Sequence, residues 1–290
     1  MTERKFVAAC VQMRSGKTVS ANVDTVVRLA REAKDGGAAY VQTPEMTNVL
    51  VRSRDELFDV ILPEEVDPAL AAFQELARAL GIWLHLGSLA IRLEGERAAN
   101  RAFVIDPDGD VTARYDKIHM FDVDLPNGES WRESQTYRPG EQAVVAELPW
   151  GGLGLTICYD VRFPTLHRAL AEHGAEVIAS PAAFTKQTGE AHWNILLRAR
   201  AIETGSFVVA AAQGGKHEDG RETFGHSLIV DPWGRVLAEG GEAPGVVLAE
   251  IDLDKSPDIR RKIPSLENGR RFGVAPAQST PTVLRDVASS

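Results

Sequence analysis

The stretch "GLGLTICYDVRFPTLHRALAEHG" (residues 152–174) places a short apolar run before an amphipathic segment. Residues 152–157 predict a buried strand because they are apolar and small. Residues 164–174 predict a helix, since Pro164 suits a first helical turn and Gly174 suits the position after the last. The apolar stretch 175–184 predicts a further strand. Strand, helix and strand in this order are typical of an α/β protein.

The same alternation extends in both directions from this unit. Strands are expected at 5–13, 38–46 and 82–91, at 206–213 and again at 245–253, with helices at 20–35, 67–81 and 191–205. Two hairpins are expected, one at 101–115 around Asp-Pro-Asp-Gly and one at 226–240. Each half of the chain therefore predicts strand–helix–strand–helix–strand followed by meandering strands.

The domain organisation follows from this repetition. No Gly/Ser-rich or charged linker separates the two halves, so we expect one domain over residues 1–270 and a tail over 271–290. The fold class is α/β, with two mixed sheets facing each other and helices outside. The polar stretch 116–140 lacks periodicity, and a long loop of this kind in a compact domain is more often functional than idle.

Composition narrows the function classes. The chain has 290 residues, 44% of them hydrophobic, and a net charge of −9, which disfavours nucleic acid and anionic membranes as partners. No apolar run approaches the ~18 residues of a membrane span, and the first residues do not resemble a signal peptide. We therefore expect a cytoplasmic protein with two reduced cysteines. The seven histidines form no metal-binding pattern, so neither a metal nor another cofactor is expected.

Three reactive side chains follow predicted strands. Glu45 comes after 38–44, Lys117 after the 101–115 hairpin and Cys158 after 152–157. α/β proteins gather their sites at strand ends. A free cysteine is more often a buried apolar residue than a nucleophile, and one residue of each type at strand ends also arises by chance. The residues alone therefore leave a core cysteine and a catalytic one both open.

The catalytic interpretation is chemically coherent. A thiol becomes a good nucleophile once it is deprotonated, and a carboxylate in a desolvated pocket can take its proton. A lysine ammonium can stabilise the oxyanion that forms when the sulfur adds to a carbonyl or nitrile carbon.

Several longer blocks resemble one family. The segments "TPE", "YDKIHMFDVDLP", "ESQTYRPG", "ICYDVRFP", "PAAFTKQTGEAHWNILLRARAIET" and "GHSLIVDPWG" are similar to those of the nitrilase superfamily of carbon–nitrogen hydrolases, most closely to the branch of omega-amidases and deaminated-glutathione amidases. They occur in order over most of the chain, which makes the signal specific. Asp116 departs from the family, since the residue before the lysine is commonly basic, and so does Thr43, where an aromatic or small apolar residue is common.

The resemblance implies a fold and a set of roles. It implies a four-layer α-β-β-α sandwich and a Glu–Lys–Cys triad at Glu45, Lys117 and Cys158. A second glutamate, Glu133, would hydrogen-bond the lysine and help orient the substrate. Members typically form homodimers or larger assemblies through helices that match residues 164–173 and 191–204.

Four residues are candidates for substrate binding. Arg162 can clamp a substrate carboxylate, or instead form a salt bridge with a neighbour such as Asp160. Phe184 and Thr188 are expected on the opposite wall, and the backbone N–H of Tyr159 can donate to the oxyanion. The expected function is cysteine-dependent hydrolysis of small linear, carboxylated amides through a thioester, with ammonia release.

Three alternatives remain at this stage. The same triad can act on N-carbamoyl compounds or nitriles. A papain-like hydrolase would pair Cys158 with a histidine such as His119 and make Glu45 incidental. A catalytically inactive scaffold on the same fold is the third, because fold alone does not assign function.

Overall fold

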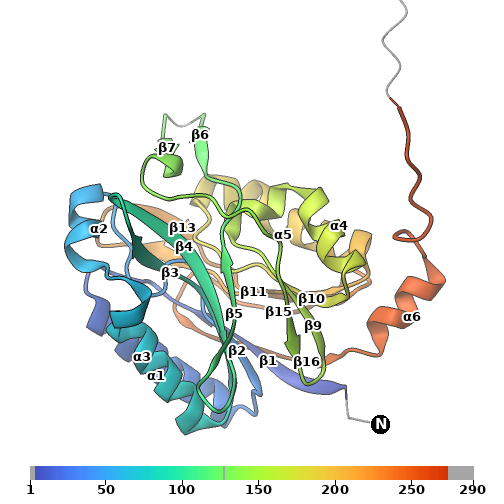
Figure 1. The fold of residues 1–290 in the computed structure, drawn as a ribbon. Helices are drawn as coiled ribbons and strands as arrows, with labels where there is room; N and C mark the ends of the chain where they lie inside the picture. The colour runs from blue at the N-terminus through green and yellow to red at the C-terminus, as the bar shows by residue number, and fades with distance from the viewer. Residues whose placement is uncertain (1–3, 127, 274–290) are drawn as a thin grey trace, which may run out of the picture.

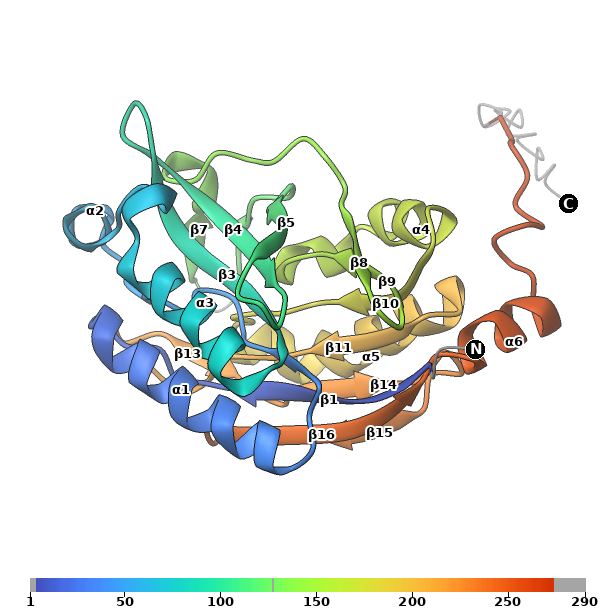
Figure 2. The same ribbon diagram turned by 60° about the horizontal axis from the view of Figure 1, so that its bottom comes forward.

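A computed structural model describes residues 4–126 and 128–273. Two six-stranded sheets face each other, with helices on their outer faces (Figures 1 and 2). This arrangement confirms the predicted fold class, two mixed sheets in an α-β-β-α sandwich. Most of the expected tail, residues 274–290, lies outside the described residues, so the division at residue 270 stays a prediction.

The first sheet contains the N-terminal strands and the last strand of the chain. Its order is β16 (Gly245–Asp252), β1 (Lys5–Gln12), β2 (Tyr40–Gln42), β3 (Trp83–Leu93), β4 (Arg97–Ile105) and β5 (Val111–Asp116). β1, β2 and β3 are parallel, whereas β16, β4 and β5 pair antiparallel to their neighbours. The edge strand beside β1 therefore comes from the far end of the sequence.

The second sheet repeats this plan. Its order is β15 (Val236–Glu239), β14 (Leu228–Val230), β11 (Phe207–Ala210), β10 (Ala175–Ala179), β9 (Gly151–Leu155) and β8 (Val145–Leu148). β9, β10 and β11 are parallel, and β8, β14 and β15 are antiparallel. The predicted likeness of the two halves is thus confirmed, although β8 was not expected from the sequence.

The helices cover the outside of the sandwich. α1 (Val19–Asp35) and α3 (Pro68–Leu80) pack on the first sheet, and α4 (Pro164–Glu172) and α5 (Lys186–Thr204) pack on the second. Pro at the start of α3 and left-handed Gly81 after it match the expected helix signals. α5 begins at Lys186, five residues before the predicted start at 191, and Thr185 is its N-cap residue.

The main core lies between the sheets. Alternate residues of β1 divide between two apolar clusters: Ala8 and Cys10 face the second sheet, while Ala9 and Val11 face α1 and α3. This alternation is the expected consequence of strand geometry when both faces of a sheet are buried.

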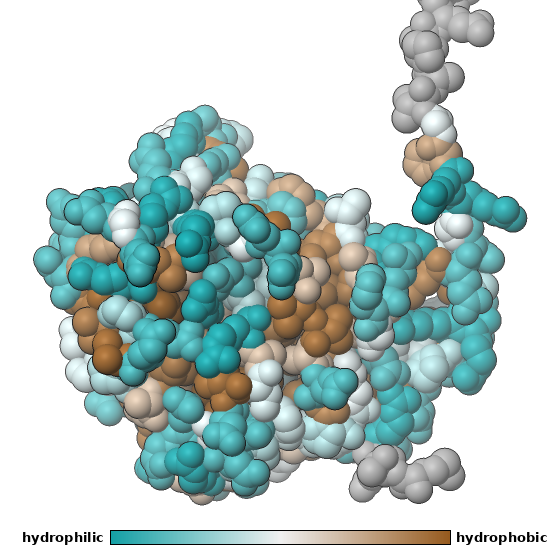
Figure 3. Space-filling view, in the orientation of Figure 1, coloured by the Kyte–Doolittle hydropathy of each residue, from teal (hydrophilic) through white to brown (hydrophobic). Residues whose placement is uncertain are grey.

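Smaller elements complete the described chain. α2 (Arg54–Val60) was not predicted as a helix, α6 (Lys255–Lys262) follows β16, and the loop 116–140 contains β6 (Asp122–Asp124) and β7 (Ser130–Arg132). β12 (Gly214–Lys216) and β13 (Glu222–Phe224) form a further hairpin. Hydrophilic side chains cover much of the face in Figure 3 and continue over α6. Within the described residues, no helix has both the length and the apolar character that crossing a bilayer requires.

Candidate active site

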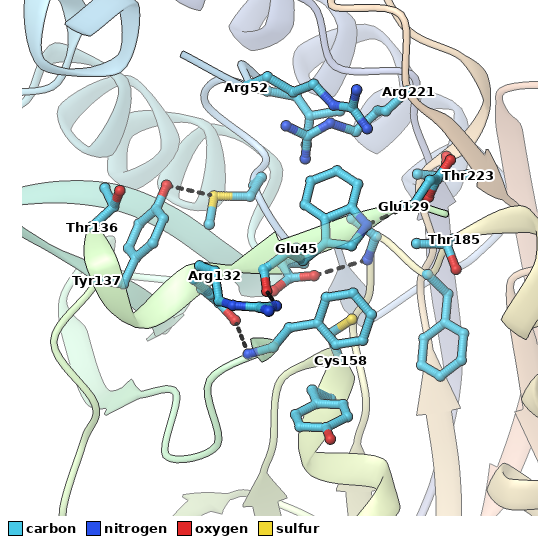
Figure 4. Close-up of a pocket in the computed structure, with 18 of the residues that line it drawn as sticks. Glu45, Arg52, Glu129, Arg132, Thr136, Tyr137, Cys158, Thr185, Arg221 and Thr223 are labelled. Atoms are coloured by element: carbon cyan, nitrogen blue, oxygen red, sulfur yellow. Dashed lines mark hydrogen bonds between the residues drawn. The ribbon is translucent and has the colours of Figure 1, made fainter. Parts of the chain in front are cut away.

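The three predicted catalytic side chains come together in one cavity. Glu45 follows β2, Lys117 follows β5 directly, and Cys158 begins the short 3-10 helix η3 (Cys158–Arg162) after β9. All three line a cavity of about 800 Å³ (Figure 4). The side chains are almost fully buried, so their charges act on one another with little screening by water.

Lys117 is held between two carboxylates. Its Nζ donates to Glu45 Oε1 at 2.9 Å and to Glu133 at 2.8 Å (Oε2) and 3.0 Å (Oε1). Glu133 also accepts the backbone N–H of Phe121 at 2.7 Å. The expected hydrogen bond between Glu133 and the lysine is therefore present, and it fixes the ammonium beside Glu45.

Asn100 connects the same two carboxylates and was not expected from the sequence. Its Nδ2 donates to Glu45 Oε1 at 2.8 Å and to Glu133 Oε1 at 3.0 Å. The other oxygen of Glu45 accepts the backbone N–H of Ala183 at 3.0 Å. Asn100 lies within β4, in "RAANRAFVI". The available signal was an amide inside a strand that also contains Arg97 and Arg101, since an amide needs polar partners when it is buried.

These contacts set the ionisation of the site. Burial raises the pKa of Glu45, but the charge of Lys117 and hydrogen bonds from Lys117, Cys158 and Asn100 outweigh it, so the net pKa is lowered. Burial opposes the charge of Lys117, yet Glu133 and Glu45 raise its pKa well above its usual value. At neutral pH the site therefore holds an ionised Glu45 beside a protonated Lys117.

Cys158 occupies an unusual backbone conformation. Its φ of 50° lies in the left-handed region, which costs a non-glycine residue energy and recurs at functional sites. Its N–H donates to the carbonyl of Pro181 at 2.8 Å, which ties the turn to the end of β10. Burial and then the charge of Glu45 raise the pKa of its thiol well above the usual value. The sulfur thus rests as a thiol next to an ionised carboxylate.

Asp160 anchors the turn that carries Cys158. Its Oδ2 accepts from the hydroxyl of Tyr115 at 2.7 Å and from the backbone N–H of Ile157 at 2.8 Å. Its Oδ1 accepts from the backbone N–H of His119 at 3.1 Å and lies 2.7 Å from His119 Nδ1. The turn after β9 is thereby fastened to the segment after β5, which brings Cys158 and Lys117 to one place.

The predicted substrate-binding residues separate into two groups. Tyr159, Phe184 and Thr188 line the cavity beside Cys158. Arg162 is not among its lining residues in the described part of the chain: its guanidinium lies over the rings of Phe184 (5.3 Å) and Tyr159 (6.0 Å). The alternative contact with Asp160 is replaced by one with His192 Nδ1 at 3.3 Å. A role for Arg162 in substrate binding stays a prediction.

The histidine of the papain-like alternative lies elsewhere. His119 stacks on Phe163 with ring centroids 3.5 Å apart and contacts Asp160. It is absent from the cavity lining among the residues described, so the geometry favours Glu45 as the partner of Cys158. Within residues 4–126 and 128–273, no group of three or more His, Cys, Asp or Glu side chains could hold a metal ion.

Comparison with known proteins gives the class. The model of the carbon–nitrogen hydrolase family matches residues 7–261. The protein therefore belongs to this family, within the nitrilase superfamily, and the predicted enzyme class, an amidase of this superfamily, is confirmed.

Individual members of the family are similar to this protein over most of its length. The chain is 40% identical over 266 residues to a deaminated glutathione amidase of Yersinia enterocolitica, covering 90% of this chain and 92% of that protein. The NitFhit protein of Caenorhabditis elegans has a similar structure, with a TM-score of 0.86 and 36% identity over 93% of this chain and 66% of that one. The amidase of Nesterenkonia sp. AN1 superposes with a TM-score of 0.75 at 29% identity, over 89% and 98% of the two chains; a Glu→Gln variant of that enzyme carries acrylamide added at its active site cysteine.

Proposed function

We propose that this protein hydrolyses the amide bond of small carboxylated amides of the deaminated-glutathione type, with Cys158 as nucleophile. The observation that carries the proposal is the ionised Glu45, held by Lys117 and Asn100 in the cavity that Cys158 lines. The relatives named deaminated glutathione amidases support the substrate class. The active site cysteine of the Nesterenkonia amidase supports a thiol nucleophile.

The first half of the reaction forms a thioester. Glu45 takes the proton of the Cys158 thiol as Sγ bonds to the amide carbon, and the carbonyl oxygen becomes an oxyanion. Lys117 Nζ and the backbone N–H of Tyr159 stabilise this oxyanion. Glu45 then returns its proton to the amide nitrogen, the C–N bond breaks, and ammonia or an amine leaves.

The second half releases the acid. Glu45 takes a proton from a water molecule, whose oxygen adds to the thioester carbon. The intermediate collapses with cleavage of the C–S bond, and the sulfur regains the proton from Glu45. The enzyme is thus returned to its starting protonation state without any cofactor.

Glu133 supports this chemistry through Lys117. Two Glu133 oxygens accept from Nζ, so the ammonium keeps a fixed position when Glu45 changes its protonation state. Lys117 consequently remains charged while Glu45 is transiently neutral, which is when the oxyanion needs it. Arg162, Phe184 and Thr188 remain our candidates for the substrate's acyl end.

The experiment is a substrate panel with matched variants. Release of ammonia or amine is measured with deaminated glutathione, omega-amides of dicarboxylic acids, N-carbamoyl amino acids and nitriles. We expect the amides to be cleaved and Cys158→Ala and Glu45→Gln to lose turnover by at least about 10²-fold, the contribution typical of a catalytic acid–base group. A Cys158→Ala variant with wild-type rates would refute the mechanism. Preference for N-carbamoyl compounds or nitriles would assign the alternative substrates to the same triad.

We also propose that the protein forms homo-oligomers through α5. Ile195 (69% exposed) and Ile202 (53%) lie seven residues apart on this helix, and Trp233 (51%) lies on the turn that Ile202 contacts. An exposed apolar strip of this kind suits an interface. Light scattering should give a dimer or larger for the wild type and a smaller species for Ile202→Asp; an unchanged mass would refute this interface.

A further inference from the structure

The far end of the cavity has a cationic rim that the proposed chemistry does not use. We define it by three residues: Arg52 before α2, Arg221 between β12 and β13, and Trp131 on β7. Both guanidinium groups lie over the indole of Trp131, at 4.7 Å for Arg52 and 5.1 Å for Arg221. Three distant segments of the sequence therefore converge to place two like charges on one ring.

Contacts within the protein hold the Arg221 side of the rim in place. Arg221 is 16% exposed and pairs with Asp219 at 2.7 Å, and its Nη2 donates to the carbonyl of Val51 at 2.9 Å. This last bond joins the β12–β13 connection to the residue next to Arg52. Stacking on an aromatic face orients a guanidinium. Its N–H groups lie in the plane of the guanidinium itself and stay available to a carboxylate.

Arg52 is the arginine of the cavity lining that forms no ion pair within the described residues. Among the described residues, the other three arginines that line the cavity are compensated, since Arg132 pairs with Asp124, Arg54 lies 3.5 Å from Glu96, and Arg221 pairs with Asp219. Arg52 takes part in none of the ion pairs that the described chain forms. Glu129, which also lines the cavity, accepts a hydrogen bond from the Trp131 indole at 3.4 Å.

The position of Glu45 decides which part of a substrate reaches the rim. Figure 4 shows Arg52 and Arg221 together on one side of the view and Cys158 on the other, with Glu45 between them. Glu45 gives its proton to the leaving nitrogen, so the leaving group extends from the sulfur toward Glu45 and beyond it. A cavity of about 800 Å³ is larger than a simple amide needs.

We propose that Arg52 and Arg221, stacked on Trp131, bind a carboxylate on the leaving amine of the substrate. Deaminated glutathione has such a group, the carboxylate of its glycine. This inference rests on the proposed function for the orientation of the substrate.

The test compares two forms of one substrate. The ratio of kcat/KM for deaminated glutathione to kcat/KM for its C-terminal carboxamide is measured for the wild type, Arg52→Gln and Arg52→Lys. We expect the wild type to favour the carboxylate by about tenfold to a hundredfold, the range for a hydrogen bond to a charged group. The ratio should fall toward one in Arg52→Gln and be partly kept in Arg52→Lys. Arg28→Gln is the matched control, because Arg28 is an exposed arginine on α1 that lies outside the described cavity lining.

A binding measurement separates this inference from the proposed function. Calorimetry on Cys158→Ala should give tighter binding of the carboxylate form than of the carboxamide, and the difference should vanish when Arg52→Gln is added. Equal affinities for the two forms, or a preference that survives Arg52→Gln, would overturn the rim as a carboxylate site. An Arg52-dependent preference in a protein that hydrolyses neither form would refute the proposed function and leave the rim established.

Discussion

Replacing Lys117 by Met tests the charge balance of the site. Lys117 is the only cation that contacts Glu45 and Glu133 among the described residues, and each carboxylate lies within 3.0 Å of its Nζ. Methionine has a similar length but no charge, so the variant leaves two carboxylates in a buried site with Asn100 as a shared donor. Removing one partner of a buried ion pair costs about 3–5 kcal/mol of unfolding free energy.

The size and the pH dependence of this loss are both predicted. For a chain of this length the unfolding entropy is about 0.6 kcal/mol/K, so 3–5 kcal/mol corresponds to a fall of roughly 5–8 °C in Tm. Without the ammonium, the burial that raises the pKa of Glu45 is no longer offset by the charge of Lys117, so its folded-state pKa rises above its unfolded value. A group with a raised folded pKa contributes stability that is present at low pH and lost as the pH rises through that pKa. The gap between variant and wild type should therefore be largest at pH 7–8 and narrow toward pH 5.

The assay is thermal or urea unfolding followed by circular dichroism at several pH values. Lys117→Met/Glu133→Gln is the matched control, because it leaves a single buried carboxylate and should recover part of the lost stability. Turnover should fall by about 10²–10³-fold in either variant through loss of the oxyanion donor. A Lys117→Met protein as stable as the wild type at pH 7, or one whose deficit is the same at every pH, would refute the reasoning.

Two further predictions follow from the same contacts. The kcat/KM of the wild type should stay level from about pH 5 to pH 8, because the pKa of Glu45 is lowered and that of Cys158 is raised. A change in kcat/KM centred near the ordinary histidine pKa of about 6.5 would instead favour the His119 mechanism. Asp160→Ala leaves the Tyr115 hydroxyl and the Ile157 N–H unpaired, at about 1–3 kcal/mol each, so Tm and the rate of Cys158 alkylation should change together. Asp160→Asn keeps an acceptor, so its Tm and alkylation rate should lie closer to those of the wild type. Equal Tm values for Asp160→Ala and the wild type would contradict the anchoring role.

The sequence was sufficient for the parts of the fold that depend on local pattern. The strand and helix periods over 5–13, 20–35 and 67–91 predicted β1, α1, α3 and β3 because each buries a regular face. α2 and β8 were missed because they are short and carry little periodic signal: β8 has four residues, and in α2 only Leu57 is buried. The meeting of β16 with β1 joins residues 245–252 to 5–12, a pairing that no local rule specifies.

The same distinction applies to the site. Glu45, Lys117 and Cys158 could be found because each follows a recognisable strand, although β2 and β5 are not neighbours in their sheet and β9 lies in the other one. Asn100 has no such position, since it lies inside β4 and becomes important only when the loop containing Glu133 folds over it. Arg52 and Arg221 could not be paired from the sequence, because only tertiary contacts bring them together. Arg221 contacts Val51, and both guanidinium groups lie over Trp131.

This contrast indicates how the two ends of the cavity differ physically. The catalytic end is held by buried, mutually dependent charges, so that a change at Lys117 alters the pKa of Glu45 and a change at Glu45 or Glu133 alters the pKa of Lys117. The two arginines of the rim lie on loops, and Arg52 is exposed and outside the buried network. Substitutions at the rim can therefore alter which amine is accepted without disturbing the ionisation that the chemistry requires. A double-mutant cycle of Arg52→Gln with Glu133→Gln should accordingly be additive in the free energy of unfolding, to within about 0.5 kcal/mol.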